Sequence, residues 1–203
     1  AETRDGRKMK PGNIPDLMPG PEITYQSYGY GWANLSNTPY RLFKQFDHEG
    51  GIRTPLIAHW PKGISSRGGL TGEVAHLVDI LPTLVELTGA RLPETSGNTQ
   101  RIPVNGRSLA AVFKGQKRQG HDFIYFSHNR GRAIRHGKWK LVQEKKKKVW
   151  ELYDLSLDPV ELHDISTKHP EITERLKERW TAWFKQQANK SSPVPGDPGK
   201  KGN

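Results

Sequence analysis

The stretch RAIRHGKWKLVQEKKKKVWELYDL, residues 132–155, alternates runs of β-branched and aromatic residues with turn signals. Runs of this composition favour strands. A His-Gly pair separates the first two runs, and the four lysines of residues 145–148 separate the last two. With DFIYFSH at residues 122–128, the pattern predicts an antiparallel meander. Trp139 and Leu141 alternate with their neighbours in KWKLVQE, which predicts one buried face of the sheet.

The segment after this meander has the pattern of an amphipathic helix. Pro170 stands in its first turn, and apolar residues then recur at spacings of four, four, three and one. This stripe consists of Ile172, Leu176, Trp180, Trp183 and Phe184. We expect the stripe to cover the sheet, with its tryptophans in the core and not in a ligand box. Residues 188–203 are rich in Lys, Ser, Pro and Gly, which predicts a disordered basic tail.

The first half of the chain has weaker patterns. Residues 1 to about 40 are rich in Gly, Pro, Asn and Tyr without a sustained period, which predicts an extended loop. TPLIAHWP, residues 54–61, has the short apolar run of a buried strand. Asp79 is placed to cap a helix over residues 80–88, with Gly89 at its end. The order of turn, strand, loop and helix favours an α/β layer.

The composition restricts the class of protein. The net charge of +11 and the pI near 9.8 suit nucleic acid, an anionic membrane surface or a polyanionic substrate. Aromatic residues do not interleave with the lysines of residues 145–148, which disfavours nucleic acid. The sequence has no run of about 18 apolar residues, and residues 1–10 lack the apolar core of a signal peptide. Because there is no cysteine, disulfides, thiolate metal sites and a cysteine nucleophile are excluded within this chain.

One stretch, RLFKQFDHEGGIRTP at residues 41–55, has residue types suited to anion binding. Lys44 could supply a point charge for a tetrahedral anion, with backbone N–H groups at the Gly-Gly pair as further donors. On residue types alone, a charged turn before a strand is the simpler interpretation. His48 is typical of a hydrogen-bonded structural residue, and Arg53 is placed to pair with Glu49 or Asp47. No Gly-x-Ser-x-Gly elbow or spaced carboxylate pair is present, so a complete active site is not visible in this chain.

Five stretches follow one another in an order that resembles a known family. They are SNTPYRLFKQFDHEGGIRTPLIAHWPKGI (36–64), HLVDILPTLVELTGA (76–90), PVNGRSL (103–109), RAIRHGKWKLV (132–142) and WELYDLSLDPVELHDIS (150–166). From about residue 32 to residue 187 the chain resembles the carboxy-terminal part of the arylsulfatase family, and bacterial members most of all. These are the formylglycine-dependent sulfatases of the alkaline-phosphatase-like superfamily.

The resemblance implies a division of labour between this chain and the rest of an enzyme. Family members hydrolyse sulfate esters, and their nucleophile is a hydrated formylglycine made from the Cys or Ser of a Cys/Ser-x-Pro-x-Arg motif. Beside it they hold a divalent metal, usually calcium (Ca2+), with Asp and Asn oxygens. The formylglycine motif is not in these 203 residues, and neither is the Asp-Asn-Gly segment that carries the last metal ligands in the family, so no metal ligand is expected here. The chain is then a carboxy-terminal portion that should be inactive alone and should expose apolar surface around residues 56–60. The family also implies a periplasmic or secreted location.

One active-site residue of the family maps onto this sequence. Lys44 stands five positions before Glu49 of the Glu-Gly-Gly turn, which is the position of the family lysine that contacts the sulfate group. The resemblance therefore makes Lys44 the candidate catalytic and substrate-binding residue. A fixed ammonium would stabilise the charge that builds on the sulfuryl oxygens. The Glu-Gly-Gly turn is expected to shape the loop, and the resemblance gives His48 no role.

The expected fold is α/β, the carboxy-terminal part of an alkaline-phosphatase-like sulfatase fold. Residues 1–120 would belong to the catalytic domain, as a long active-site loop, a core strand and a flanking helix. Residues 121–187 would form a four-stranded antiparallel sheet covered by the last helix, and residues 188–203 the tail. The implied partners are the rest of the catalytic domain and a sulfated substrate, which the sequence leaves open among polysaccharide, steroid and small aryl ester.

Two rival functions stay open at this point. A phosphatase or phosphonate-type hydrolase of the same superfamily would share the fold, because fold alone does not give function. A non-catalytic module that binds polyanions would use the lysines of residues 145–148 and the basic tail.

Overall fold

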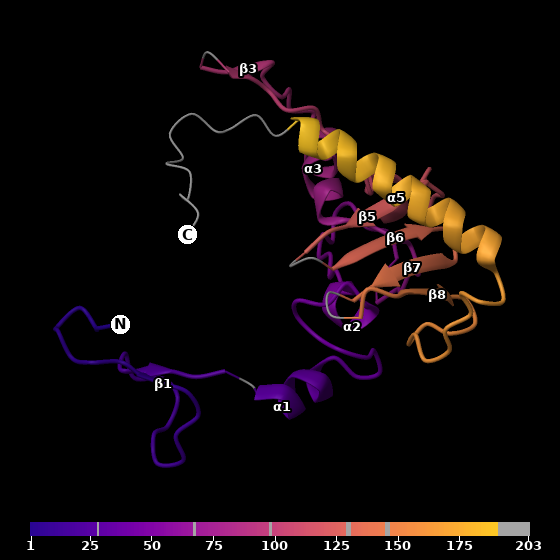
Figure 1. Cartoon of the computed structure of the whole chain (residues 1–203). Coiled ribbons are helices and arrows are strands. Elements are labelled where there is room, and N and C mark those ends of the chain that lie inside the picture. The colour runs from indigo at the N-terminus through magenta and orange to yellow at the C-terminus, as the bar shows by residue number, and fades with distance from the viewer. Residues whose placement is uncertain (28, 67, 98, 129–130, 145–146, 191–203) are drawn as a thin grey trace.

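An antiparallel sheet of four strands, in the order β5-β6-β7-β8, lies under a long helix in the carboxy-terminal half of the protein (Figure 1). The computed structural model describes residues 1–27, 29–66, 68–97, 99–128, 131–144 and 147–190. The strands are β5 Ile124–Phe126, β6 Arg132–His136, β7 Trp139–Gln143 and β8 Trp150–Asp154. The predicted meander and the α/β class are therefore confirmed.

Turn chemistry sets the register of the central hairpin. His136 of β6 pairs with Trp139 of β7, so only two residues join the strands. The first of them, Gly137, has φ 56°, a left-handed conformation that glycine adopts without steric cost. At the other end of β7, Gln143 pairs with Trp150 and sets the register of β8.

One face of this sheet, here called the apolar face, packs against helix α5 Pro170–Lys190. Its buried core consists of Ile134, Leu141, Leu152, Leu176 and Trp180. The predicted helix and its stripe are confirmed, with Phe184 at the edge and 44% exposed. The helix continues to Lys190, so the predicted tail began too early, and residues 191–203 lie outside the described part of the chain.

The opposite face, here called the polar face, is buried as well, although one buried face was predicted. Its apolar members are Ala133, Val142, Tyr153 and Leu155. Lys140 and Glu151 lie on the same face and are 0% and 9% exposed. The segment that reaches them is residues 47–52, which includes the short helix α2 Glu49–Ile52. The alternation in β7 thus separates two chemically different interiors and not an interior from solvent.

The amino-terminal region extends away from the sheet in Figure 1. Strand β1 Lys10–Pro11 pairs in parallel with β2 Thr24–Tyr25. Helix α1 Gly29–Ser36 follows, which corrects the prediction of an uninterrupted loop. This helix buries none of its residues, so no apolar stripe of helical period was present in the sequence to indicate it.

The segment predicted as a buried strand belongs to no helix or sheet among the described residues. Leu56, Ile57 and Trp60 are 57%, 90% and 41% exposed. The predicted exposure of apolar surface around these residues is confirmed. Pairing of this segment in a larger sheet stays a prediction.

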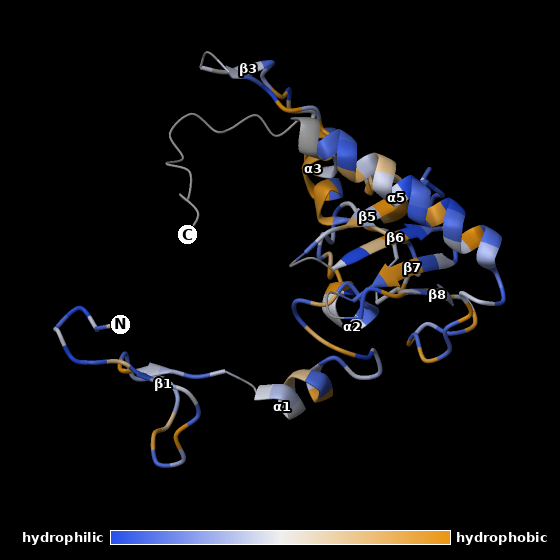
Figure 2. Cartoon of the chain, in the orientation of Figure 1, coloured by the Kyte–Doolittle hydropathy of each residue, from blue (hydrophilic) through white to orange (hydrophobic). Residues whose placement is uncertain are grey.

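Helix α3 Ile80–Thr88 follows the 3-10 turn η1 Leu77–Asp79 and ends at Gly89, which has φ 68° as expected of a glycine terminator. Figure 2 shows this helix as largely hydrophobic. Leu81 and Leu84 are 46% and 54% exposed, so its apolar side is uncovered in the described chain. The remaining short elements are β3 Thr95–Ser96, β4 Thr99–Gln100 and α4 Ala110–Phe113.

Asp79 precedes α3 as predicted, but its carboxylate does not cap that helix. The side chain is 0% exposed and accepts from the backbone N–H groups of His76 (3.0 Å) and Arg107 (2.8 Å). It also pairs with Arg118 and His121 at 3.3 and 2.6 Å. Burial acts to raise its pKa, but these hydrogen bonds outweigh burial and lower it. Asp79 therefore ties η1 to the segment after α3.

None of the helices within the described ranges combines the length and the apolar composition that crossing a membrane requires.

Candidate functional site

Lys44 lies exposed at the tip of a closed loop, residues 41–49, here called the Lys44 loop. The Gly50 N–H donates to the Arg41 carbonyl (3.1 Å) and closes the base of the loop. The Phe46 N–H donates to the Phe43 carbonyl (3.1 Å) and forms the turn that carries Lys44. Within the described part of the chain Lys44 has no ion pair, so its ammonium group has no internal counter-charge.

The two glycines after Glu49 have a steric function. A Cβ at Gly50 would overlap the carbonyl groups of Arg41 and Leu42, and a Cβ at Gly51 would overlap the Phe46 carbonyl. Only glycine lets α2 approach the loop backbone this closely. The expectation that the Gly-Gly pair shapes the loop is confirmed, although the pair lies in a short helix and not in a turn.

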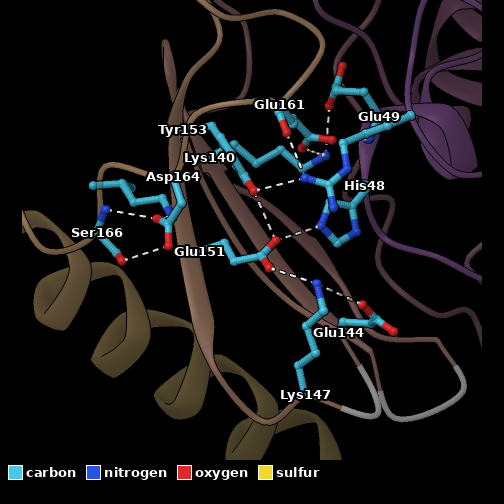
Figure 3. Close-up of polar contacts among 12 residues, drawn as sticks. His48, Glu49, Lys140, Glu144, Lys147, Glu151, Tyr153, Glu161, Asp164 and Ser166 are labelled. Atoms are coloured by element: carbon cyan, nitrogen blue, oxygen red, sulfur yellow. Dashed lines mark hydrogen bonds and ion pairs between the residues drawn. The ribbon is translucent and has the colours of Figure 1, made fainter.

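A buried ion-paired cluster anchors the amino end of α2 to the sheet. Lys140 Nζ lies 2.8 Å from Glu49 Oε1 and 2.8 Å from Glu161 Oε1. Glu161 Oε2 also accepts from the Glu49 backbone N–H (2.7 Å). The three side chains, shown in Figure 3, are at most 3% exposed. We call them the Lys140 cluster.

A second buried contact lies beside this cluster. His48 Nε2 and Glu151 Oε2 are 2.9 Å apart, and the Tyr153 hydroxyl donates to the same carboxylate at 2.9 Å (Figure 3). The His48 hydrogen bond, against the opposing effect of burial, lowers the pKa of Glu151 to about 2. Burial and the neighbouring Glu151 charge raise the pKa of Tyr153 well above its ordinary value. Glu151 is thus an acceptor held in its charged form, and His48 is a buried structural residue as predicted.

The other arm of the Lys44 loop is anchored to the same face. Arg41 donates from Nη1 to the Glu161 carbonyl (2.7 Å) and to the Tyr153 hydroxyl (3.2 Å). Asp47, next to His48, is 4% exposed, and burial raises its pKa. Both arms are therefore held by the polar face, and only the tip with Lys44 is free.

Of the two acids expected as partners of Arg53, the structure pairs it with Glu49. Its Nη1 lies 3.6 Å from Glu49 Oε2 at the partly exposed edge of the Lys140 cluster. Lys147 contacts Glu151 and Glu144 at 3.5 and 3.6 Å, while residues 145–146 of the lysine run lie outside the described residues. In the described ranges no group of three or more His, Cys, Asp or Glu residues is arranged to hold a metal ion.

The residues that sequence reasoning missed are the anchors Lys140, Glu151, Tyr153 and Glu161. Lys140 alternates with Trp139 and Leu141, which is the pattern of a solvent-facing lysine. Its partner Glu49 lies 91 positions away, so no local spacing indicates the pair. A charged residue inside an otherwise apolar strand was the one available signal.

Comparison with known proteins gives one family. Residues 39–186 match the family model described as N-sulphoglucosamine sulphohydrolase, C-terminal. A sulfatase of Schizosaccharomyces pombe is 35% identical over 162 residues, which cover 77% of this chain and 29% of that protein. Bovine arylsulfatase A is 36% identical over 127 residues, which cover 60% of this chain and 22% of that enzyme. The chain thus spans less than a third of the length of these relatives.

A solved structure from work on glycosaminoglycan metabolism by Bacteroides thetaiotaomicron is similar in fold. It aligns with a TM-score of 0.56 at 25% sequence identity. The alignment covers 70% of this chain and 31% of that one.

Proposed function

This chain belongs to the sulfatase family, and we propose that it is the carboxy-terminal part of a sulfuric ester hydrolase to which it contributes Lys44. The observation that carries the proposal is the placement of Lys44. It is the exposed tip of a loop whose first arm is half-buried and whose second arm ends in buried residues, and its ammonium group has no counter-charge in the described chain. A cation fixed in this way is suited to bind an anion from outside the chain.

The proposed role of Lys44 is electrostatic. Hydrolysis of a sulfate ester breaks an S–O bond with water and yields an alcohol and sulfate. Negative charge on the sulfuryl oxygens and the leaving oxygen increases as that bond breaks. A positioned ammonium stabilises this charge without having to reorganise, which lowers the barrier.

The proposal assigns the formylglycine nucleophile and calcium to parts of the full-length protein outside this chain. The described residues offer no ligand set for a metal ion, and the sequence has no cysteine. The relatives are more than twice as long as the chain, which leaves room for both groups. Bound calcium would supply positive charge beside the sulfate; this chain's own contribution is Lys44 and the structure that holds it.

The proposed substrate class is a sulfate ester on a small molecule or a polysaccharide. The net charge of +11 favours an anionic substrate over a neutral one. Named relatives include an arylsulfatase and a steryl-sulfatase, so the family alone does not decide between these esters. We propose a periplasmic or secreted location, as the family resemblance implies.

The test is a Lys44→Ala substitution in the full-length enzyme, with Lys168→Ala as the matched control. Lys168 is also exposed, but it lies beyond the sheet and not on the Lys44 loop. We expect kcat/KM for an aryl sulfate to fall about 100-fold to 1,000-fold for Lys44→Ala and to stay unchanged for the control. Unchanged kinetics for Lys44→Ala would remove this lysine from the site. A wild-type enzyme that hydrolyses phosphate esters but not sulfate esters would overturn the proposed reaction.

The isolated chain provides a second test. We expect the purified 203-residue chain to lack sulfatase activity with or without added calcium, because no metal ligand set is present in its described residues. The full-length enzyme, assayed beside it on the same aryl sulfate, is the control. Metal-dependent turnover by the chain alone would contradict the proposed division of labour.

A further inference from the structure

Both arms of the Lys44 loop are anchored on one patch of the polar face. Arg41 on the first arm bonds to Tyr153 and to the Glu161 backbone. Glu49 at the end of the second arm bonds to Lys140 and Glu161. Glu161 therefore contacts both arms, one through its carbonyl and the other through its carboxylate.

Stability alone does not account for the Lys140 cluster. Moving an ammonium group and two carboxylates out of water costs several kcal/mol per ion, and well-packed apolar residues in their place are often as stable or more so. The apolar face of the same sheet shows that such packing is available in this fold. Ion pairs fix the direction and the distance between their two groups, which apolar contacts do not.

Backbone strain is concentrated in the same place. Four non-glycine residues in the described chain have positive φ. Two of them, Leu42 (φ 66°) and Gln45 (φ 84°), flank Lys44, and a third is Glu161 (φ 61°). Such conformations cost about 1–3 kcal/mol each and persist where the surroundings fix them, which is common at functional sites. Two of these strained residues thus lie in the loop that presents Lys44, and the third, Glu161, anchors both arms of that loop.

We infer that Lys140 and Glu161 are positioning residues for Lys44, so that the carboxy-terminal sheet is a working part of the sulfate site. This inference rests on the proposed function. The cluster fixes Glu49, and the closed loop carries that fixed position over five residues to Lys44. A displacement of about 1 Å at such a group lowers a rate by roughly 100-fold.

A double-mutant cycle in the full-length enzyme tests the inference. The variant combines Lys140→Met with Glu161→Gln, so that the remaining Glu49 keeps its ion pair with Arg53. We expect this pair of changes to lower kcat about 10-fold to 100-fold when Lys44 is present. In a Lys44→Ala background the same pair of changes should alter kcat less than about twofold, because the group that it positions is absent.

The control is Lys138→Met. Lys138 lies two residues from Lys140 and pairs with Asp154 at 2.7 Å, but its side chain is 51% exposed and contacts no part of the Lys44 loop. We expect less than about a twofold change in kcat in both backgrounds. The control separates loss of an ion pair in this sheet from loss of the loop anchor.

The outcomes distinguish this inference from the proposed function. An inactive wild-type enzyme, or full activity of Lys44→Ala, would defeat the proposed function. If Lys44→Ala is impaired but the paired variant lowers kcat by the same factor in both backgrounds, the cluster acts independently of Lys44 and the inference is wrong. Should the paired variant fail to fold, Tyr153→Phe, which preserves volume and releases one Arg41 contact, replaces it in the same cycle with the same two outcomes.

Discussion

The two faces of the four-stranded sheet are both buried, but they are buried by different chemistry. Under α5 the interior consists of Leu, Ile and Trp side chains. On the other face Lys140 and Glu151 lie among apolar neighbours and contact the Lys44 loop. Apolar burial is non-directional and roughly proportional to area, whereas ion pairs depend on exact partners and geometry. We therefore expect the apolar face to contribute most of the stability of this sheet, and the polar face to fix the position of the Lys44 loop.

The largest effect is expected on the apolar face. Trp180 is 2% exposed, stacks on Phe184 at 4.9 Å and donates from Nε1 to the Phe126 carbonyl. Trp180→Ala should lower the free energy of unfolding by about 3–5 kcal/mol through lost burial and a cavity. Urea unfolding of the full-length protein measures this, with Phe184→Ala at the helix edge as a milder control. Because the apolar face is expected to contribute stability and not the position of Lys44, kcat of the folded Trp180→Ala enzyme should stay near the wild-type value.

On the polar face, the expected effect depends on pH through Glu151. Its pKa is about 2 in the folded protein, against an ordinary 4.5. A depressed acid pKa gives stability that is complete above pH 4.5 and is lost as the pH falls toward 2. The shift corresponds to about 3 kcal/mol. The free energy of unfolding, measured with urea at pH values between 2 and 6, should therefore decrease as the pH is lowered.

Glu151→Gln is the variant that isolates the Glu151 contribution. The substitution should remove the part of this pH dependence between pH 2 and 6 that comes from Glu151. Asp47, whose pKa is raised by burial, acts in the opposite direction, so the difference between variant and wild type is the quantity to measure. An identical pH profile for both proteins would contradict the role given to Glu151.

A smaller effect is expected for Tyr153→Phe. The hydroxyl accepts from Arg41 and donates to Glu151, so its loss leaves the half-buried Arg41 and the buried Glu151 with one fewer partner each. We expect a loss of about 1–2 kcal/mol in the free energy of unfolding. Hydrogen exchange should quicken in residues 41–50 before it changes in α5. If hydrogen exchange quickened equally in residues 41–50 and in α5, the polar face would not hold the Lys44 loop separately from the apolar face.

Much of the fold could be predicted because its signals are local. The strands and α5 are indicated by composition and by periods of two and 3.6 residues, and the turn at Gly137 by its conformational freedom. Lys44 could be named because its spacing to Glu49 resembles a family motif. Helix α1 was missed because it buries nothing. The role of Lys44 and the boundaries of the domains stay predictions.

The sequence by itself determined the meander, the covering helix and the identity of the candidate lysine, because periodicity, turn residues and a short motif act over a few positions. Only the tertiary structure decided that Lys140 is interior and that Glu161 holds both arms of the Lys44 loop. These contacts join residues 91 and 120 positions apart. A local pattern shows which face of a strand a side chain occupies, but what covers that face depends on how distant segments pack.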